Sequence, residues 1–250
     1  MDLGARIAAE KFYRDLREVF PDYAADFEQK FTEWQGKWFD PESPGSSSAL
    51  ERCELPEYDP LLFLGPKTIP LLVFELTKPG NFIATTLYNH LETDPQAKVD
   101  PEDIINYLTL NRHANLIVEL NHERAQRVRR RLEAWKTRCR QLQQQQQPGQ
   151  LQKQQSAELD TTACEEYDAL VAMGSGIIAH VMLEYSKDRA GPWCQLMHQL
   201  VCEKPMGVMA HPGGLKQYEA WRDWFENREH HEAAEEGLMP AYLNNVGRWS

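Results

Sequence analysis

The sequence lacks the features that direct a chain out of the cell or into a membrane. Its five cysteines include no C-x-x-C pair, and no N-x-S/T sequon occurs. No stretch approaches the roughly 20 apolar residues of a membrane span, and the N-terminus has no apolar signal-peptide core. We therefore expect a soluble, cytoplasmic protein with reduced thiols and no membrane association.

Positive charge is also scarce, because 27 Lys and Arg face 38 Asp and Glu, for a formal charge of −11. An acidic chain of this kind argues against a general nucleic-acid binder. The sequence contains no P-loop, no G-x-G-x-x-G after a strand, no G-x-S-x-G elbow and no H-E-x-x-H. Neither a cofactor nor a metal is predicted.

What the sequence does contain is helical periodicity, while runs of β-branched residues with period two are nearly absent. Between residues 22 and 38 the large side chains recur at spacings of four, four, three and four: Tyr23, Phe27, Phe31, Trp34 and Trp38. A second stripe predicts a helix over residues 3–19, and residues 158–229 read as helical again. The fold class is therefore predicted to be all-α.

A long helix is predicted from Asp100, a capping residue followed by Pro101, to about residue 140, with a break possible at 111–115. Ten of the fifteen residues of 141–155 are glutamine, which predicts a disordered linker over 141–157 and weakly suggests a eukaryotic source. The linker separates an N-terminal helical half, 1–140, from a C-terminal half, 158–250. We expect the two halves to form one compact domain.

Residues 57–76 and 166–185 resemble each other. Seven of their positions, offset by 109 residues, are identical: Glu57/Glu166, Tyr58/Tyr167, Asp59/Asp168, Leu61/Leu170, Gly65/Gly174, Ile69/Ile178 and Glu75/Glu184. This likeness predicts an internal duplication of a three-helix unit, with copies at 57–91 and 166–201 joined through the long helix.

Each copy has a short helix, a glycine break and an amphipathic helix, and this unit resembles those of HEAT-repeat and related α-solenoid proteins. The resemblance is carried by Leu64-Gly65-Pro66, Ile69-Pro70-Leu71-Leu72 and Leu76, and by Met173-Gly174, Ile177-Ile178 and Val181. It implies a helical repeat-like array with a concave surface, and no particular chemistry.

One residue departs from the duplicated pattern, because His180 stands where the first copy has Leu71. On a helix His180 shares a face with Glu184, and His198 on the following helix could approach both. These three are the candidate catalytic residues, as acid/base groups. The competing interpretation is a histidine that is satisfied structurally at a partly buried position.

Three other groups have a chemical and a structural interpretation. Glu119 and His122 form one Glu-x-x-His pair, whereas a di-iron site needs two such pairs. His230 and His231 lie among glutamates, and adjacent residues of a helix point to different sides of it. We interpret both as solvated helix faces, although the sequence leaves metal binding open. The basic run 123–140 is interpreted as a charged outer face or a partner-binding helix.

Two functions stay open. The first is an interaction scaffold that presents a groove to a protein partner. The second is an all-helical enzyme or binding protein for an apolar or aromatic small molecule, with His180, Glu184 and His198 in a pocket between the repeat halves. Long amphipathic helices also make homodimerisation conceivable.

Overall fold

The computed structural model describes residues 1–40, 51–99, 107–145, 162–203 and 214–226. Every regular element in these ranges is an α-helix or a 3₁₀ turn, with no strand. The all-α prediction is confirmed for this part of the chain.

The first two helices follow the predicted stripes. Helix α1 spans Leu3–Val19, and the carboxylate of Asp2 caps it by accepting from the amide of Ala5. Helix α2 spans Pro21–Trp38, with proline at its first position, where the missing N–H is not needed. All five large residues of the α2 stripe are buried, as the spacing predicts.

Helix α6 spans Tyr107–Gln145 and is 39 residues long. It runs without interruption through 111–115, where the sequence leaves a break open, and it extends as far as Gln145, beyond the predicted end near residue 140. The predicted start at Asp100 and residues 146–157 of the predicted linker lie outside the described residues. At 1.5 Å per residue α6 is roughly 58 Å long, enough to pack along both halves.

The two predicted copies, which begin at residues 57 and 166, fold into the same succession of α-helices. The first contains α3 (Tyr58–Leu62), α4 (Ile69–Glu75) and α5 (Ala84–Leu91), and the second α7 (Glu165–Val171), α8 (Ile178–Lys187) and α9 (Trp193–Cys202). In each, a glycine and a 3₁₀ turn join the first helix to the second, at Pro66–Thr68 and Ser175–Ile177. These two turns lie against each other at the centre of the fold.

Gly65 and Gly174 hold nearly the same backbone conformation, with φ and ψ of 74° and −177°, and of 70° and −170°. This region is essentially restricted to glycine. We expect Gly65→Ala and Gly174→Ala each to lower the free energy of unfolding by about 1–3 kcal/mol in urea titrations. A matched control is Gly36→Ala in α2, where an added Cβ meets nothing within 4 Å. That change should stabilise by roughly 0.5–1 kcal/mol, and a loss equal to those at Gly65 and Gly174 would contradict the conformational explanation.

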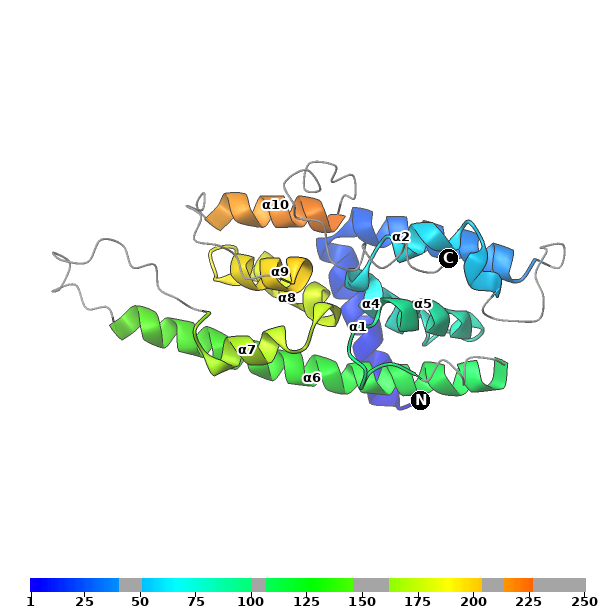
Figure 1. Cartoon of the computed structure of the whole chain (residues 1–250), viewed down its shortest axis with the longest axis horizontal. Helices are drawn as coiled ribbons and strands as arrows, with labels where there is room; N and C mark the ends of the chain where they lie inside the picture. The colour runs from blue at the N-terminus through cyan, green and yellow to red at the C-terminus, as the bar shows by residue number, and fades with distance from the viewer. Residues whose placement is uncertain (41–50, 100–106, 146–161, 204–213, 227–250) are drawn as a thin grey trace.

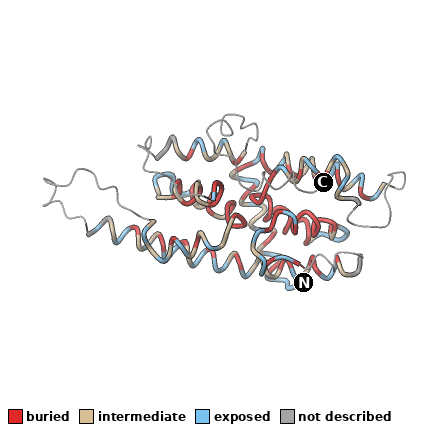
Figure 2. The backbone as a smooth tube through the Cα atoms, viewed as in Figure 1, coloured by how far each residue is buried: buried red, intermediate tan, exposed pale blue. Residues whose placement is uncertain are grey.

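The helices lie in three tiers, crossed by α1 (Figure 1). Helix α2 and helix α10 (Gly214–Glu226) form one outer tier, α6 runs along the opposite side, and α4, α5, α8 and α9 fill the middle. Buried residues concentrate in this middle tier (Figure 2).

Helix α2 and the C-terminal half of α6 occupy diagonally opposite corners of the fold (Figure 1). Their inward stripes share one spacing: Tyr23, Phe27, Phe31, Trp34 and Trp38 in α2, and Arg124, Val128, Leu132, Trp135 and Cys139 in α6, all buried. The tryptophans make similar contacts, because Trp34 lies 5.3 Å from Tyr58 at 53° and Trp135 lies 5.7 Å from Tyr167 at 54° between ring centroids and planes. Both helices therefore hold the following short helix in the same manner.

Candidate functional site

His180 lies on α8 and is half-buried, whereas Leu71, its counterpart on α4, is fully buried. Its imidazole packs on the ring of Phe12 from α1, with 4.3 Å between centroids. In the described part of the chain no hydrogen bond reaches the imidazole. The contact that holds His180 is therefore an aromatic one.

Burial lowers the pKa of His180 to about 3, and Arg124 and Arg129 act in the same direction against the weaker opposing influence of Glu184. The imidazole is consequently neutral at physiological pH. Because the native pKa lies below the unfolded value of about 6.5, only the unfolded state takes up a proton as the pH falls from 6.5 toward 3, which destabilises the native state over that window.

We expect His180→Leu, which restores the residue of the first copy, to reduce this acid destabilisation. The free energy of unfolding of the native chain should fall relative to the variant by an amount on the order of 1 kcal/mol between pH 7 and pH 5. Urea titrations of both proteins at the two pH values measure the difference. Parallel pH profiles would contradict a half-buried imidazole that stays neutral at this position.

Glu184 binds two lysines on the surface of the fold. Its carboxylate accepts from Lys136 of α6 at 2.6 Å and from Lys187 at 2.7 Å. Burial raises the pKa of Glu184, but these hydrogen bonds outweigh that effect and lower it overall. The first copy repeats the local pair, because Lys78 donates to Glu75 at 2.7 Å.

His198 lies on α9, next to α8. Neither His180 nor Glu184 is hydrogen-bonded to His198, or to the other, among the residues that the structure describes. The catalytic role of the three remains a prediction.

The structure gives Glu119 and His122 different hydrogen-bond partners. Glu119 accepts from the backbone amide of Asp2 at 2.9 Å, while Nε2 of His122 is hydrogen-bonded to the amide of Gln126 at 2.8 Å. Within the described ranges no group of three His, Cys, Asp or Glu side chains could hold a metal ion. His230 and His231 lie outside those ranges.

A thiol, a phenol and an imidazole meet beside α3 and α5. The Tyr58 hydroxyl and Nδ1 of His90 are hydrogen-bonded, and the thiol of Cys53 bonds to Tyr58 and Thr86. Burial raises the pKa of Cys53 and lowers that of His90. All three groups are therefore neutral near pH 7, and the cluster is not an activated cysteine nucleophile.

The most buried charged pair of the described chain, Arg124 and Glu92, was not predicted. The two side chains are 2% and 1% exposed and join at 2.7 Å, and the second guanidinium nitrogen of Arg124 lies 3.8 Å from Asp94. Glu92 also accepts from Tyr88 at 3.1 Å and from two backbone amides at 2.9 Å. This network ties α5 to the centre of α6.

Lys67 is a second buried cation, 4% exposed, in the 3₁₀ turn of the first copy. Its ammonium donates to the backbone carbonyls of Trp224 at 3.1 Å and Phe225 at 2.6 Å, near the end of α10. The rings of Tyr23, Trp224 and Phe225 surround it at 4.8–5.3 Å. Lys67 thereby anchors α10 to the first copy.

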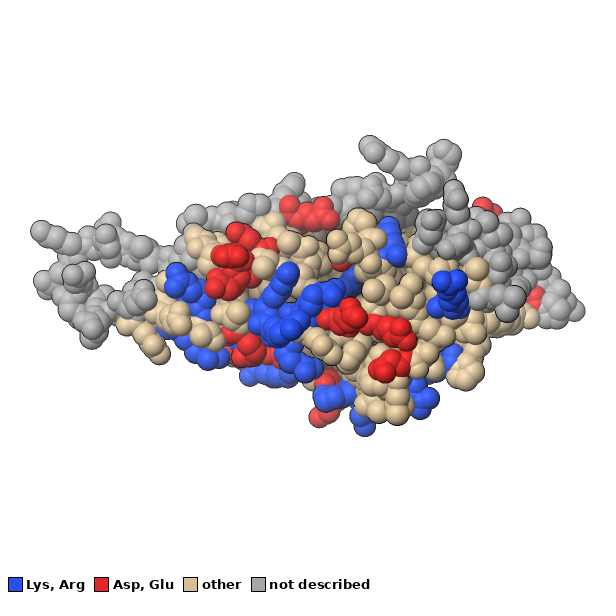
Figure 3. Space-filling model, turned by 90° about the horizontal axis from the view of Figure 1, so that it is seen from below, with Lys and Arg blue, Asp and Glu red and all other residues tan. Residues whose placement is uncertain are grey.

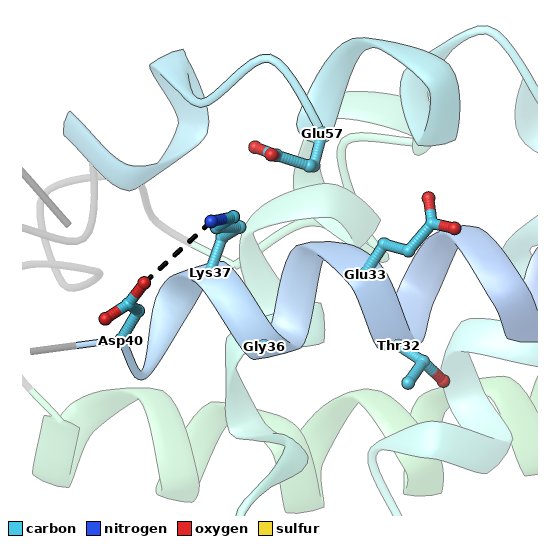
Figure 4. A pocket seen from close by; sticks show the side chains of 6 residues that line it. All are labelled: Thr32, Glu33, Gly36, Lys37, Asp40 and Glu57. Atoms are coloured by element: carbon cyan, nitrogen blue, oxygen red, sulfur yellow. Dashed lines mark ion pairs between the residues drawn. The ribbon is translucent and has the colours of Figure 1, made fainter. Parts of the chain in front are cut away.

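A shallow hollow of about 350 Å³ lies between the C-terminal end of α2 and Glu57 (Figure 4). Its floor is Gly36, and its rim carries Glu33, Asp40 and Lys37, the last two 3.9 Å apart. None of the residues that line it lies on α8 or α9, which carry the predicted catalytic residues. The hollow is open to solvent, so it does not form an enclosed small-molecule site.

The C-terminal half of α6 presents a basic surface beside acidic side chains (Figure 3). Arg129, Arg130 and Arg140 are exposed and Arg138 is half-buried, and none of the four has an ion-pair partner in the described ranges. Arg127 pairs with Glu123 at 3.8 Å, and Arg131 donates to the carbonyl of Ala169. The predicted charged outer face is thus present, except that Arg124 of the same run turns inward.

Comparisons with known protein families, curated proteins and solved structures found no match to this chain. Among the described residues no single helix is long and apolar enough to cross a membrane. One pair of helical segments, Glu165–Val171 and Ser175–Lys187, reaches that length and apolar composition only when the two are counted together. A bend of 96° separates them.

Proposed function

We propose that this protein is a cytoplasmic interaction scaffold built from two copies of one helical unit. The matched glycine conformations, the matched Glu–Lys pairs and the common stripe spacing of α2 and α6 support the duplication. On this view α6 serves both copies: its N-terminal half ends the first and its C-terminal half begins the second. Five free cysteines agree with a reducing compartment.

The observation that carries the scaffold proposal is exposed apolar surface where α1 meets α6. Leu3 and Ile7 of α1 are 64% and 53% exposed, and Leu116 of α6 is 44% exposed. The start of α1 contacts Glu119, one turn after Leu116, through the amide of Asp2. Apolar side chains that stay exposed on two helices in contact are available to an apolar surface of a protein partner.

Affinity purification of the tagged full chain from its native cells, after chemical cross-linking, tests this proposal. We expect a stoichiometric protein partner that is lost with the variant Leu3→Gln, Ile7→Gln, Leu116→Gln. The control is Arg6→Gln, Glu10→Gln, which alters an exposed ion pair on the same helix α1. Recovery of the same proteins by both variants, or of no protein by the native chain, would overturn it. Sedimentation of the purified chain shows whether the partner is a second copy.

The alternative, a small-molecule enzyme or binding protein, is supported by one observation. His180 presents a neutral imidazole, without a hydrogen bond in the described ranges, beside the half-buried ring of Phe12. A planar aromatic ligand could stack there and accept or donate one hydrogen bond. Thermal-shift screening of aromatic fragments tests this, with His180→Leu as the variant that should abolish any stabilisation.

A further inference from the structure

The outward arginines of α6 are not required by the fold. Helix α2 has an inward stripe of the same spacing and the same contact with a following tyrosine, yet its charged residues are mainly acidic. Residues 22–39 contain two Lys and four Asp or Glu, whereas the equivalent residues 123–140 contain eight Lys or Arg and two Glu. At three equivalent positions, Asp26, Glu28 and Gln29 of α2 correspond to Arg127, Arg129 and Arg130 of α6.

Several of these arginines gain nothing from intramolecular pairing. Arg129, Arg130, Arg138 and Arg140 have no carboxylate within ion-pair distance among the residues that the structure describes. Four guanidinium groups along about three helical turns place positive charge across the outward half of α6, in a chain whose net charge is −11. A surface charge that neither folding nor local pairing explains is available to a partner.

We propose that this basic face of α6, defined by Arg127, Arg129, Arg130, Arg138 and Arg140, binds an acidic polypeptide segment. The inference rests on the proposed scaffold function and specifies the chemistry of one partner. Guanidinium groups pair with carboxylates through two parallel hydrogen bonds, and their planar forks lose less freedom than lysines on binding.

A polypeptide suits the face better than a nucleic acid. Glu123 and Glu133 interrupt the arginines on the outward side and would face an evenly charged phosphate backbone. A peptide can place carboxylates opposite the arginines and uncharged residues opposite the glutamates. The overall negative charge of the chain further disfavours a long polyanion.

The test uses the full chain and a fluorescein-labelled helical peptide of about 20 residues with glutamate at every third or fourth position. Fluorescence anisotropy should show binding at ~50 mM salt that weakens at ~300 mM. The variant Arg127→Asp, Arg129→Glu, Arg130→Gln carries the residues of α2 and should bind about tenfold or more weakly. The matched control, Arg6→Asp, Lys11→Glu, Arg14→Gln, makes the same charge change on α1. Once salt screens the repulsion between these added negative charges and the acidic peptide, the control should bind the peptide as tightly as the native chain does.

Three results would overturn this inference: no binding of the peptide to the native chain, equal weakening in the two variants, or tighter binding of a labelled single-stranded oligonucleotide of the same length. Circular dichroism establishes that both variants keep their helix content. The scaffold proposal fails separately, because its own test concerns Leu3, Ile7 and Leu116. A native partner that depends on those residues, with no binding of the acidic peptide, would leave the scaffold in place and reject only the acidic segment.

Discussion

Arg124→Met is expected to lower the free energy of unfolding by about 3–5 kcal/mol. The change removes the guanidinium that lies 2.7 Å from Glu92 and leaves that carboxylate, 1% exposed, without its cation. Breaking a buried ion pair on one side costs more than the pair itself contributes, because the remaining charge stays out of water. Urea denaturation followed by circular dichroism measures the loss.

The second partner supplies the control for this prediction. Glu92→Gln in the Arg124→Met background removes the stranded charge, so the double variant should recover part of the stability, and a double-mutant cycle gives the coupling. Arg130→Met, an exposed arginine of the same helix, should change stability by less than about 0.5 kcal/mol. Equal losses for Arg124→Met and Arg130→Met would contradict the assignment of Arg124 as the buried cation.

The helices of the fold could be predicted because one side of each must be apolar, which leaves a periodic pattern in the sequence. Stripes of large residues located α1 and α2, and the shared Tyr-Asp and glycine of the two windows located two like successions of helices. Near the glutamine tract the prediction was less accurate, because glutamine is itself a good helix former and α6 includes residues 141–145, which its composition assigned to the linker.

The buried cation Arg124 was harder to predict. The sequence has eight basic residues in 123–140, and which of them points inward is known only once the helix is packed in the fold. One signal was available: Arg124 stands four residues before Val128, as Tyr23 stands four residues before Phe27. The two copies also carry their buried cation on different elements. In the first copy the cation is Lys67 on the turn, 5.1 Å from Tyr23, and in the second the turn has Gly176 and the helix supplies Arg124.

The glycine of the second turn is necessary for this different placement of the cation. A Cβ on Gly176 would lie 2.7 Å from the guanidinium of Arg124 and 3.5 Å from Glu92. A side chain at position 176 and an arginine at position 124 therefore compete for one space. Such compensation involves residues far apart in the sequence, so each residue alone gives no sign of it.

Lys67→Met should release α10 while most of the fold persists. The thioether side chain fills similar volume but cannot donate to the carbonyls of Trp224 and Phe225, which lie at the negative end of the α10 dipole. Hydrogen bonds from a charged donor contribute about 1.5–3 kcal/mol each, and the surrounding rings add a cation–π attraction. We expect α10 to lose about 2–4 kcal/mol of local stability, measured as faster amide hydrogen exchange in residues 214–226.

The remaining helices provide the reference for that measurement. Helix α5 packs against α4 and α6, so the protection of its amides should change much less than that of α10. Phe225 packs on Phe20 and Tyr23 at 4.6 and 4.7 Å, and this packing limits how far α10 departs. Lys67→Arg keeps the charge and the donors, and should retain more protection than Lys67→Met. If α10 of Lys67→Met exchanges as slowly as α10 of the native chain, the volume at position 67 holds α10 in place, and the buried cation does not.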